Sequence, residues 1–285
     1  MRLKIHSHTR YDYEKPASFS PHIIRLFPRQ DVSQSLKRSR FTTDESAVVQ
    51  HRRDIFDNQV ARCFLPKKGK TLKFDVRLDI ELTERSAFDF LLDNHVINFP
   101  FAYTARERAI LAPYLHQSAE EWVVAGDIWN VKPGQSTVEA LISLNEALNS
   151  KIQYERREEG EAWLPAETVR VRRGSCRDFS RLAASLLRSA GVAVRMVSGY
   201  VCEFGKPEEA KRAVGSLHAW IEAYLPGAGW LGMDPTNGVL TDHHFIASAV
   251  GLHPEDISPV AGSYYGRERI PAQMTTTLSL EPLYK

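Results

Sequence analysis

Hydrophobic and polar residues alternate with a period of two in parts of the first hundred residues. Residues 76–82 (Val-Arg-Leu-Asp-Ile-Glu-Leu) show this alternation most clearly, as expected for a strand with one buried face. Residues 23–27 and 60–65 are shorter candidate strands. Because no helical period is visible before about residue 104, the pattern predicts a β-sandwich-like domain over residues 1–102.

The pattern becomes helical after this point. Residues 136–139 (Ser-Thr-Val-Glu) form a capping-box signature at the start of one predicted helix. The clearest helical period covers residues 177–190, where apolar residues lie on one face and Gly191 follows at the expected C-terminal cap. We therefore assign residues 103–285 to a second domain, the one that carries the candidate chemistry.

Short apolar runs separated by turn residues follow that helix. Residues 192–201, 218–225 and 230–234 are predicted strands, and residues 226–229 (Pro-Gly-Ala-Gly) are a turn that makes the last two a hairpin. Helices and antiparallel strands in the same region predict an α+β fold, in which the helix over residues 177–190 packs on a sheet.

Composition and charge narrow the possible functions. With 43% hydrophobic and 25% charged residues the chain is an ordinary globular protein, and its net charge of +2 gives no case for binding nucleic acid or an anionic membrane. Three cysteines cannot form a closed disulfide framework. The first residues lack the apolar segment of a signal peptide, and no apolar run is long enough to span a membrane. We therefore expect a cytoplasmic protein.

Cys176 is the first candidate for chemistry because it directly precedes the clearest predicted helix. At a helix N-terminus the unpaired N–H groups and the positive end of the helix dipole stabilise a thiolate. Such a position, especially beside an imidazolium, can lower a cysteine pKa to roughly 3.5–7.5. The same N–H groups can donate to the oxyanion of a tetrahedral intermediate. Position alone also fits a small buried residue at a cap, so the partners of Cys176 decide its interpretation.

His218 and Asp234 are those partners, one on each strand of the predicted hairpin. Thiol, imidazole and carboxylate are the nucleophile, the base and the orienting group of thiol-based acyl transfer. Simple pairing of Leu225 with Trp230 would leave His218 on the wrong face for Asp234. We therefore predict an odd-numbered turn, or a bulge at Gly229, which brings the imidazole and the carboxylate to one face.

At these residues the chain resembles the transglutaminase-like superfamily. The match is closer to a bacterial branch with an N-terminal β-domain, whose members are described as candidate cysteine proteases. The resemblance covers nearly the whole chain. It is carried by Gly-Ser-Cys-Arg-Asp-Phe at 174–179, Val-Ser-Gly-Tyr at 197–200, His-Ala-Trp-Ile-Glu-Ala-Tyr at 218–224 and Asp-Pro-Thr-Asn-Gly at 234–238.

The resemblance implies a papain-like α+β core with Cys176 as nucleophile, His218 as base and Asp234 as the residue that orients the base. It also implies chemistry at an amide carbonyl without a metal or an organic cofactor. No side chain that completes the oxyanion hole is evident, although Tyr154 and Trp163 are upstream aromatic candidates that fit a wall or core role better.

Other residues have a functional and a structural interpretation of similar weight. Arg177, Tyr200 and Trp220 are candidate substrate-binding residues, but a helix-surface arginine and strand aromatics are also ordinary structural features. His243 and His244 are adjacent, and on an extended chain their side chains would point to opposite faces, which argues against a metal site.

We expect thiol-dependent hydrolysis of a peptide or isopeptide amide in a peptide or protein substrate. The first alternative is a transglutaminase, in which an amine rather than water resolves the acyl-enzyme. The second is a non-catalytic scaffold that binds a peptide or protein. The sequence leaves the substrate, the oligomeric state and the role of the N-terminal domain open.

Overall fold

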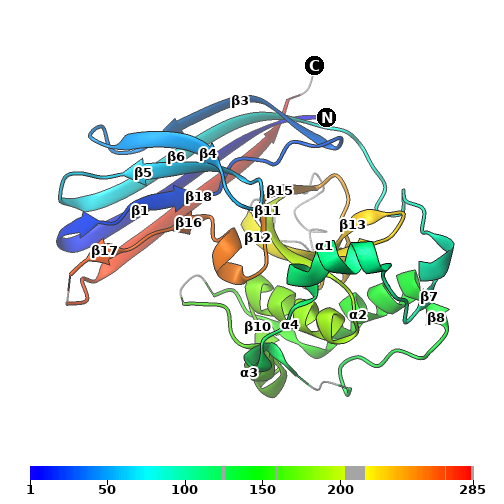
Figure 1. Cartoon of the computed structure of the whole chain (residues 1–285). Helices are drawn as coiled ribbons and strands as arrows, with labels where there is room; N and C mark the ends of the chain where they lie inside the picture. The colour runs from blue at the N-terminus through cyan, green and yellow to red at the C-terminus, as the bar shows by residue number, and fades with distance from the viewer. Residues whose placement is uncertain (124–125, 158–159, 203–215, 267, 284–285) are drawn as a thin grey trace.

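The computed structural model of the chain describes residues 1–123, 126–157, 160–202, 216–266 and 268–283. Two sheets form a β-sandwich, and the helices gather beside a further sheet that adjoins it (Figure 1). This arrangement confirms the expected α+β class with a β-rich N-terminal region. Within the described residues, no helix has the length and apolar character needed to cross a membrane.

The first sheet of the sandwich is built on two long antiparallel strands, β1 (Arg2–Phe19) and β6 (Gly69–Leu82). Every second residue of β6 from Leu72 to Leu82 is almost fully buried, in agreement with the predicted period of two. The remaining strands of this sheet are β3 (Gln34–Thr42) beside β6, and β17 (Tyr264–Tyr265) and β18 (Ala272–Pro282) beside β1.

The second sheet of the sandwich covers the buried face of the first, and its outer strands are short. Its strands, in spatial order, are β16 (Val260–Ala261), β2 (His22–Ile24), β5 (Gln59–Phe64) and β4 (Val48–Arg53). Apolar residues of both sheets, among them Leu3, Ile24 and Phe74, form one buried cluster.

The end of the chain returns to this sandwich. β18 pairs with β1 from Leu3 opposite Pro282 to Tyr13 opposite Ala272. The described residues 260–282 therefore lie in the sandwich, although the sequence placed them in the segment 103–285. The physical reason is that β18 supplies hydrogen-bond partners to the otherwise open edge of β1.

The core sheet is antiparallel and has the order β14-β13-β12-β11-β15. Its strands are β11 (Val194–Val201), β12 (Ser216–Leu225), β13 (Gly229–Asp234), β14 (Val239–Leu240) and β15 (Phe245–Gly251). Helices α2 (Thr137–Lys151) and α4 (Cys176–Ser189) share an apolar cluster with β12 residues such as Ile221 and Ala223. This is the predicted packing of a helix on a sheet.

Short elements connect these parts. They are α1 (Ala105–Leu115), α3 (Pro165–Val171), β7 (Asn98–Phe99), β8 (Gln135–Ser136), β9 (Gln153–Tyr154), β10 (Arg173–Gly174), and 3-10 turns at Asn94–Val96, Ala119–Glu121 and Pro254–Ile257.

The hairpin of β12 and β13 has the predicted irregular turn. Leu225 pairs with Gly229, which leaves three residues in the turn, and Ile221 pairs with Met233. Gly227 and Gly229 both have positive φ, 90° and 77°, a conformation that glycine adopts without steric cost. The resulting register sets His218 and Asp234 on the same face of the hairpin.

Candidate active site

Cys176 is the first residue of α4, as the sequence predicted. The preceding Ser175 is the N-cap residue, and Asp178 accepts hydrogen bonds from its backbone N–H at 2.7 Å and from its hydroxyl at 2.8 Å. This capping arrangement fixes the start of the helix and so the position of the thiol. Cys176 is partly exposed, whereas Cys63 and Cys202 are buried.

Asp178 has further hydrogen-bond partners besides Ser175. Its side chain is fully buried and also accepts from both the Arg157 guanidinium, at 2.7 and 2.8 Å, and the backbone N–H of Trp163, at 2.6 Å. Burial raises the pKa of the carboxyl, but these hydrogen bonds outweigh it, so the pKa is below its ordinary value. Asp178 thus connects Arg157 and Trp163, which precede α4, to Ser175, the residue before Cys176.

His218 lies next to Asp234 in the interior of the site. Their side chains are 2% and 0% exposed, and His218 Nε2 is 3.0 Å from Asp234 Oδ2. Asp234 also accepts from the backbone N–H of Thr236 at 3.0 Å and from Asn237 Nδ2 at 2.5 Å. Every one of these partners donates to the carboxylate, so Asp234 is held in place and the imidazole is oriented by it.

The Cys176 thiol is in hydrogen-bonding contact with the His218 imidazole. Because Nε2 faces Asp234, it is Nδ1 that faces the sulfur. Burial, the largest single influence, raises the pKa of Cys176, but the hydrogen bond and charge of His218 and the backbone N–H of Ala219 together lower it below its ordinary value. Burial lowers the pKa of His218, yet Asp234 and Cys176 raise it to about 10. Both directions favour a thiolate–imidazolium pair.

Trp220 packs against the His218 imidazole. Its indole stacks on His218 with ring centroids 6.4 Å apart and 22° between the planes, and it is only 1% exposed. Gly199 permits this arrangement, because a Cβ there would lie 2.8 Å from the Trp220 ring and 2.0 Å from the Ile246 carbonyl oxygen. Trp220 therefore contacts the candidate base and is not an open surface for substrate.

Tyr154 lies beside the nucleophile. Its strand β9 pairs in parallel with β10, where Tyr154 is opposite Gly174, two residues before Cys176. The pKa of the phenol is raised, first by burial and then by the negative charges of Cys176 and Asp234. Tyr154 thus stays protonated and can donate a hydrogen bond at the site. The other aromatic candidate, Trp163, packs under the Arg157 guanidinium at 4.5 Å.

Two of the candidate substrate-binding residues have structural partners. The Arg177 guanidinium donates to the carbonyls of Gly160 and Arg157, each at 3.0 Å. Tyr200 is fully buried and donates its hydroxyl to the Leu26 carbonyl at 2.8 Å. Gly199, not Tyr200, pairs with His218, so Tyr200 projects from the face of the sheet opposite to His218. On that face it packs against the sandwich.

The prediction that the side chains of His243 and His244 point to opposite faces of an extended chain was wrong. The chain turns at these residues, and the centroids of the two imidazole rings are 4.2 Å apart. The Asp242 carboxylate lies beside both rings. These three side chains have hydrogen-bond partners within the protein: His244 Nδ1 is 3.0 Å from Asp242 Oδ1, and His243 Nδ1 is 3.2 Å from the Arg85 carbonyl. The His244 interactions lower the pKa of Asp242 to about 2, although burial raises it.

Sequence reasoning gave no individual role to Arg157, Gly199 or Asn237. The signal for Asn237 was present, because Asp-Pro-Thr-Asn-Gly is typical of a turn in which an aspartate accepts hydrogen bonds from the following residues. The partners of Arg157 and Gly199 come from other elements, and no local pattern indicates them.

Comparison with known proteins matches both parts of the chain. A model of the transglutaminase-like superfamily matches residues 128–235, and a model of the bacterial transglutaminase-like N-terminal region matches residues 3–81. An uncharacterized protein of Mycobacterium leprae is 27% identical over 272 residues, which are 93% of this chain and 94% of that protein.

One further relative and one solved structure carry descriptive names. A "Protein-glutamine gamma-glutamyltransferase" of Pseudomonas aeruginosa is 37% identical over 68 residues, 23% of this chain and 10% of that protein. A crystal structure of a "Putative Cysteine Protease" from Cytophaga hutchinsonii superposes with a TM-score of 0.73 and 16% identity, covering 100% of this chain and 92% of that chain. The last likeness shows that the two chains share their whole fold.

Proposed function

Because this chain joins a bacterial transglutaminase-like N-terminal region to a transglutaminase-like core, we propose that it hydrolyses peptide or isopeptide amides through a thioester on Cys176. One observation carries the proposal: the His218 imidazole contacts the Cys176 thiol on one side and the buried Asp234 carboxylate on the other. This is the constellation of a nucleophile, a base and an orienting acid.

In the first half of the reaction the Cys176 thiolate attacks the amide carbonyl carbon. A C–S bond forms and the carbonyl electrons move to oxygen, which gives a tetrahedral oxyanion. When this intermediate collapses, the C–N bond breaks and His218 gives its Nδ1 proton to the departing amine. Asp234 remains ionised and stabilises the imidazolium until that proton leaves. A thioester and a neutral imidazole result.

In the second half a water molecule attacks the thioester. His218 Nδ1 accepts a proton from the water as the C–O bond forms, and the C–S bond then breaks. The products are a carboxylic acid and the original thiolate–imidazolium pair. The backbone N–H of Cys176, at the start of α4, and the protonated phenol of Tyr154 are the proposed donors to the oxyanion in both halves.

Acyl transfer to an amine is the second candidate, and the name of the Pseudomonas aeruginosa relative favours it. The same thioester would form, and an amine would replace water in the second half.

Free cysteines support a reducing compartment, so we propose the cytoplasm as the place of action, which fractionation of cells would test.

The test is to incubate the protein with a mixture of peptides in ¹⁸O-water containing a primary amine such as dansylcadaverine, and to analyse the products by mass spectrometry. Hydrolysis gives carboxylates carrying one ¹⁸O, and transfer gives dansylated peptides. We expect the ¹⁸O products to dominate, and Cys176→Ala to form neither. Mainly dansylated peptides would instead establish a transglutaminase. Products that do not depend on Cys176, or no products at all, would contradict thiol catalysis.

A further inference from the structure

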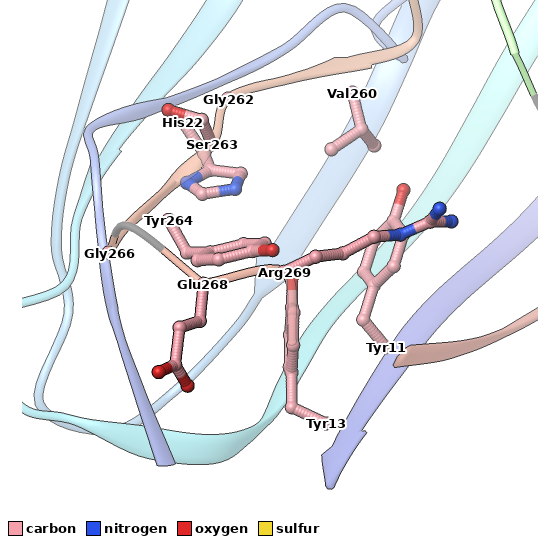
Figure 2. Close-up of a pocket in the computed structure, with 10 residues that line it drawn as sticks. All are labelled: Tyr11, Tyr13, His22, Val260, Gly262, Ser263, Tyr264, Gly266, Glu268 and Arg269. Carbon is pink, nitrogen blue, oxygen red and sulfur yellow. The ribbon is translucent and has the colours of Figure 1, made fainter. Parts of the chain in front are cut away.

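A pocket of about 600 Å³ opens at the edge of the sandwich, between β1 and the segment that returns from the core (Figure 2). The pairing of β1 with its neighbouring strands explains the position of this pocket. The register of β1 against β6 shifts between Asp12 and Ala17, and along its other edge β1 pairs with β18 as far as Tyr13 and with β17 from Ser18. Regular pairing is therefore interrupted along both edges of β1 at the same place, and the pocket lies there.

His22 forms one wall of this pocket and carries an acceptor into it. The residue is 4% exposed, and its Nδ1 donates to the Ser20 carbonyl at 2.8 Å. Burial lowers the pKa of the imidazole in spite of that hydrogen bond, so the ring is neutral and Nε2 has a free lone pair. Gly262 makes room for the ring, because a Cβ there would lie 2.4 to 2.6 Å from its atoms.

Three tyrosines supply hydroxyl donors. Tyr11 and Tyr13 are two residues apart on β1 and so project from the same face. Tyr264 packs edge-on against Tyr13, with ring centroids 5.9 Å apart. Its oxygen accepts from the Ile270 backbone N–H at 2.8 Å, which leaves its own proton for a ligand. Figure 2 shows the hydroxyl ends of Tyr13 and Tyr264 directed toward each other below the His22 ring.

Arg269 adds a positive charge at the mouth. In Figure 2 its side chain extends across the pocket toward the hydroxyl of Tyr11, whereas the carboxylate of Glu268 points away from the interior. The pocket thus offers a guanidinium and several phenols as donors, and the neutral His22 imidazole nitrogen as an acceptor directed at the ligand. A matching ligand has an anionic, acceptor-rich end, one adjacent donor and some apolar surface to pack on the rings.

We propose that this pocket binds the C-terminal residue of a peptide. The terminal carboxylate would accept from Arg269 and from the phenols of Tyr11 and Tyr13. The amide N–H of the same residue would donate to His22 Nε2, and its side chain would pack on the tyrosine rings. The proposal is independent of the catalytic one, because it concerns residues of the sandwich and requires no reaction.

The experiment compares two matched peptides, acetyl-Ala-Ala-Phe as the free acid and as the C-terminal amide. Binding is measured by calorimetry to the full chain carrying Cys176→Ala, so that no peptide is consumed. We expect the acid to bind at least about tenfold more tightly than the amide, because the carboxylate makes charge-assisted hydrogen bonds that the amide cannot.

Variants assign this preference to the pocket. Arg269→Gln should remove the difference between acid and amide, and Tyr13→Phe should weaken binding of the acid. Arg40→Gln is the control, because Arg40 is exposed on β3 at the opposite edge of the same sheet, and it should bind as the parent does. Equal binding of acid and amide, no binding at millimolar peptide, or acetate binding as tightly as the peptide acid would each overturn the proposal.

Discussion

The core and the sandwich of this chain assemble their sites in opposite ways. In the core, the three candidate catalytic residues lie within residues 176–234, and each is placed by a local feature: a helix start for Cys176, and a hairpin register for His218 and Asp234. In the sandwich, the pocket combines residues 11–22 with residues 260–269, near the two ends of the sequence.

The two sites should therefore differ in how well they tolerate substitution. The candidate catalytic residues are positioned by capping hydrogen bonds and strand pairing that involve few neighbours, so we expect that their side chains can be replaced without loss of the fold. The pocket depends on pairing of β1 with both β17 and β18, so its geometry depends on the fold of the whole sandwich.

The largest effect is expected for Cys176→Ala. Removal of the nucleophile should lower kcat by roughly 10⁵-fold or more, while the thermal midpoint stays nearly unchanged, because Cys176 lies on the edge of a small apolar cluster with Met196 and Ala219 and not at its centre. Activity assays and calorimetric melting provide the two readouts. An unfolded variant would mean that the thiol is structural.

A smaller loss of rate is expected for Asp234→Asn. The carboxylate accepts from three donors, and an amide has one oxygen for them, so its NH₂ group would face His218 and favour the wrong tautomer. We expect kcat to fall by about 10⁴-fold with the fold retained, the value typical of this substitution in a triad. Full activity in the folded variant would remove Asp234 from the mechanism.

Asp178→Asn should act on stability. Its carboxyl is buried against Arg157, and loss of one partner of a buried pair costs about 3 kcal/mol or more. The folded-state pKa is lowered, so the stabilisation is complete above the unfolded-state pKa of about 3.9 and is lost as the pH falls through the folded-state value.

Urea unfolding at neutral and acid pH measures this difference between parent and variant. The difference should be full at neutral pH and should shrink below about pH 4. Asp127→Asn is the control, since Asp127 pairs with Arg172 in an exposed position, and its effect on unfolding should be much smaller. A difference of equal size at both pH values would contradict the charge-based account of Asp178.

The three candidate catalytic residues could be singled out from the sequence because their signals are local. The apolar period of residues 177–190 placed Cys176 at the helix start. The irregular register of the hairpin was predicted because simple pairing would have kept His218 and Asp234 on opposite faces. Pairing of β18 with β1 was not predictable, because a strand signal does not say which distant edge the strand will join. The buried position of Tyr200 follows from that same distant packing.

The smallest of these effects is expected for Gly199→Ala, which tests whether Trp220 supports His218. The added methyl would overlap the Ile246 carbonyl and the indole, a cost of about 1–3 kcal/mol in urea unfolding. Displacement of the indole should also slow alkylation of Cys176. Gly126→Ala is the matched control, because no atom lies within 4 Å of a Cβ at Gly126. Unchanged alkylation in the Gly199 variant would leave Trp220 with a packing role alone.

The pH profile of iodoacetamide alkylation would reveal whether Cys176 and His218 form a thiolate–imidazolium pair. Cys63 and Cys202 are internal controls, because burial raises the pKa of each thiol to about 12. We predict fast labelling of Cys176 that persists well below the free-thiol value of about 8.5 and is lost in His218→Ala. Labelling that rises only near that value, and equally in both proteins, would contradict the pair.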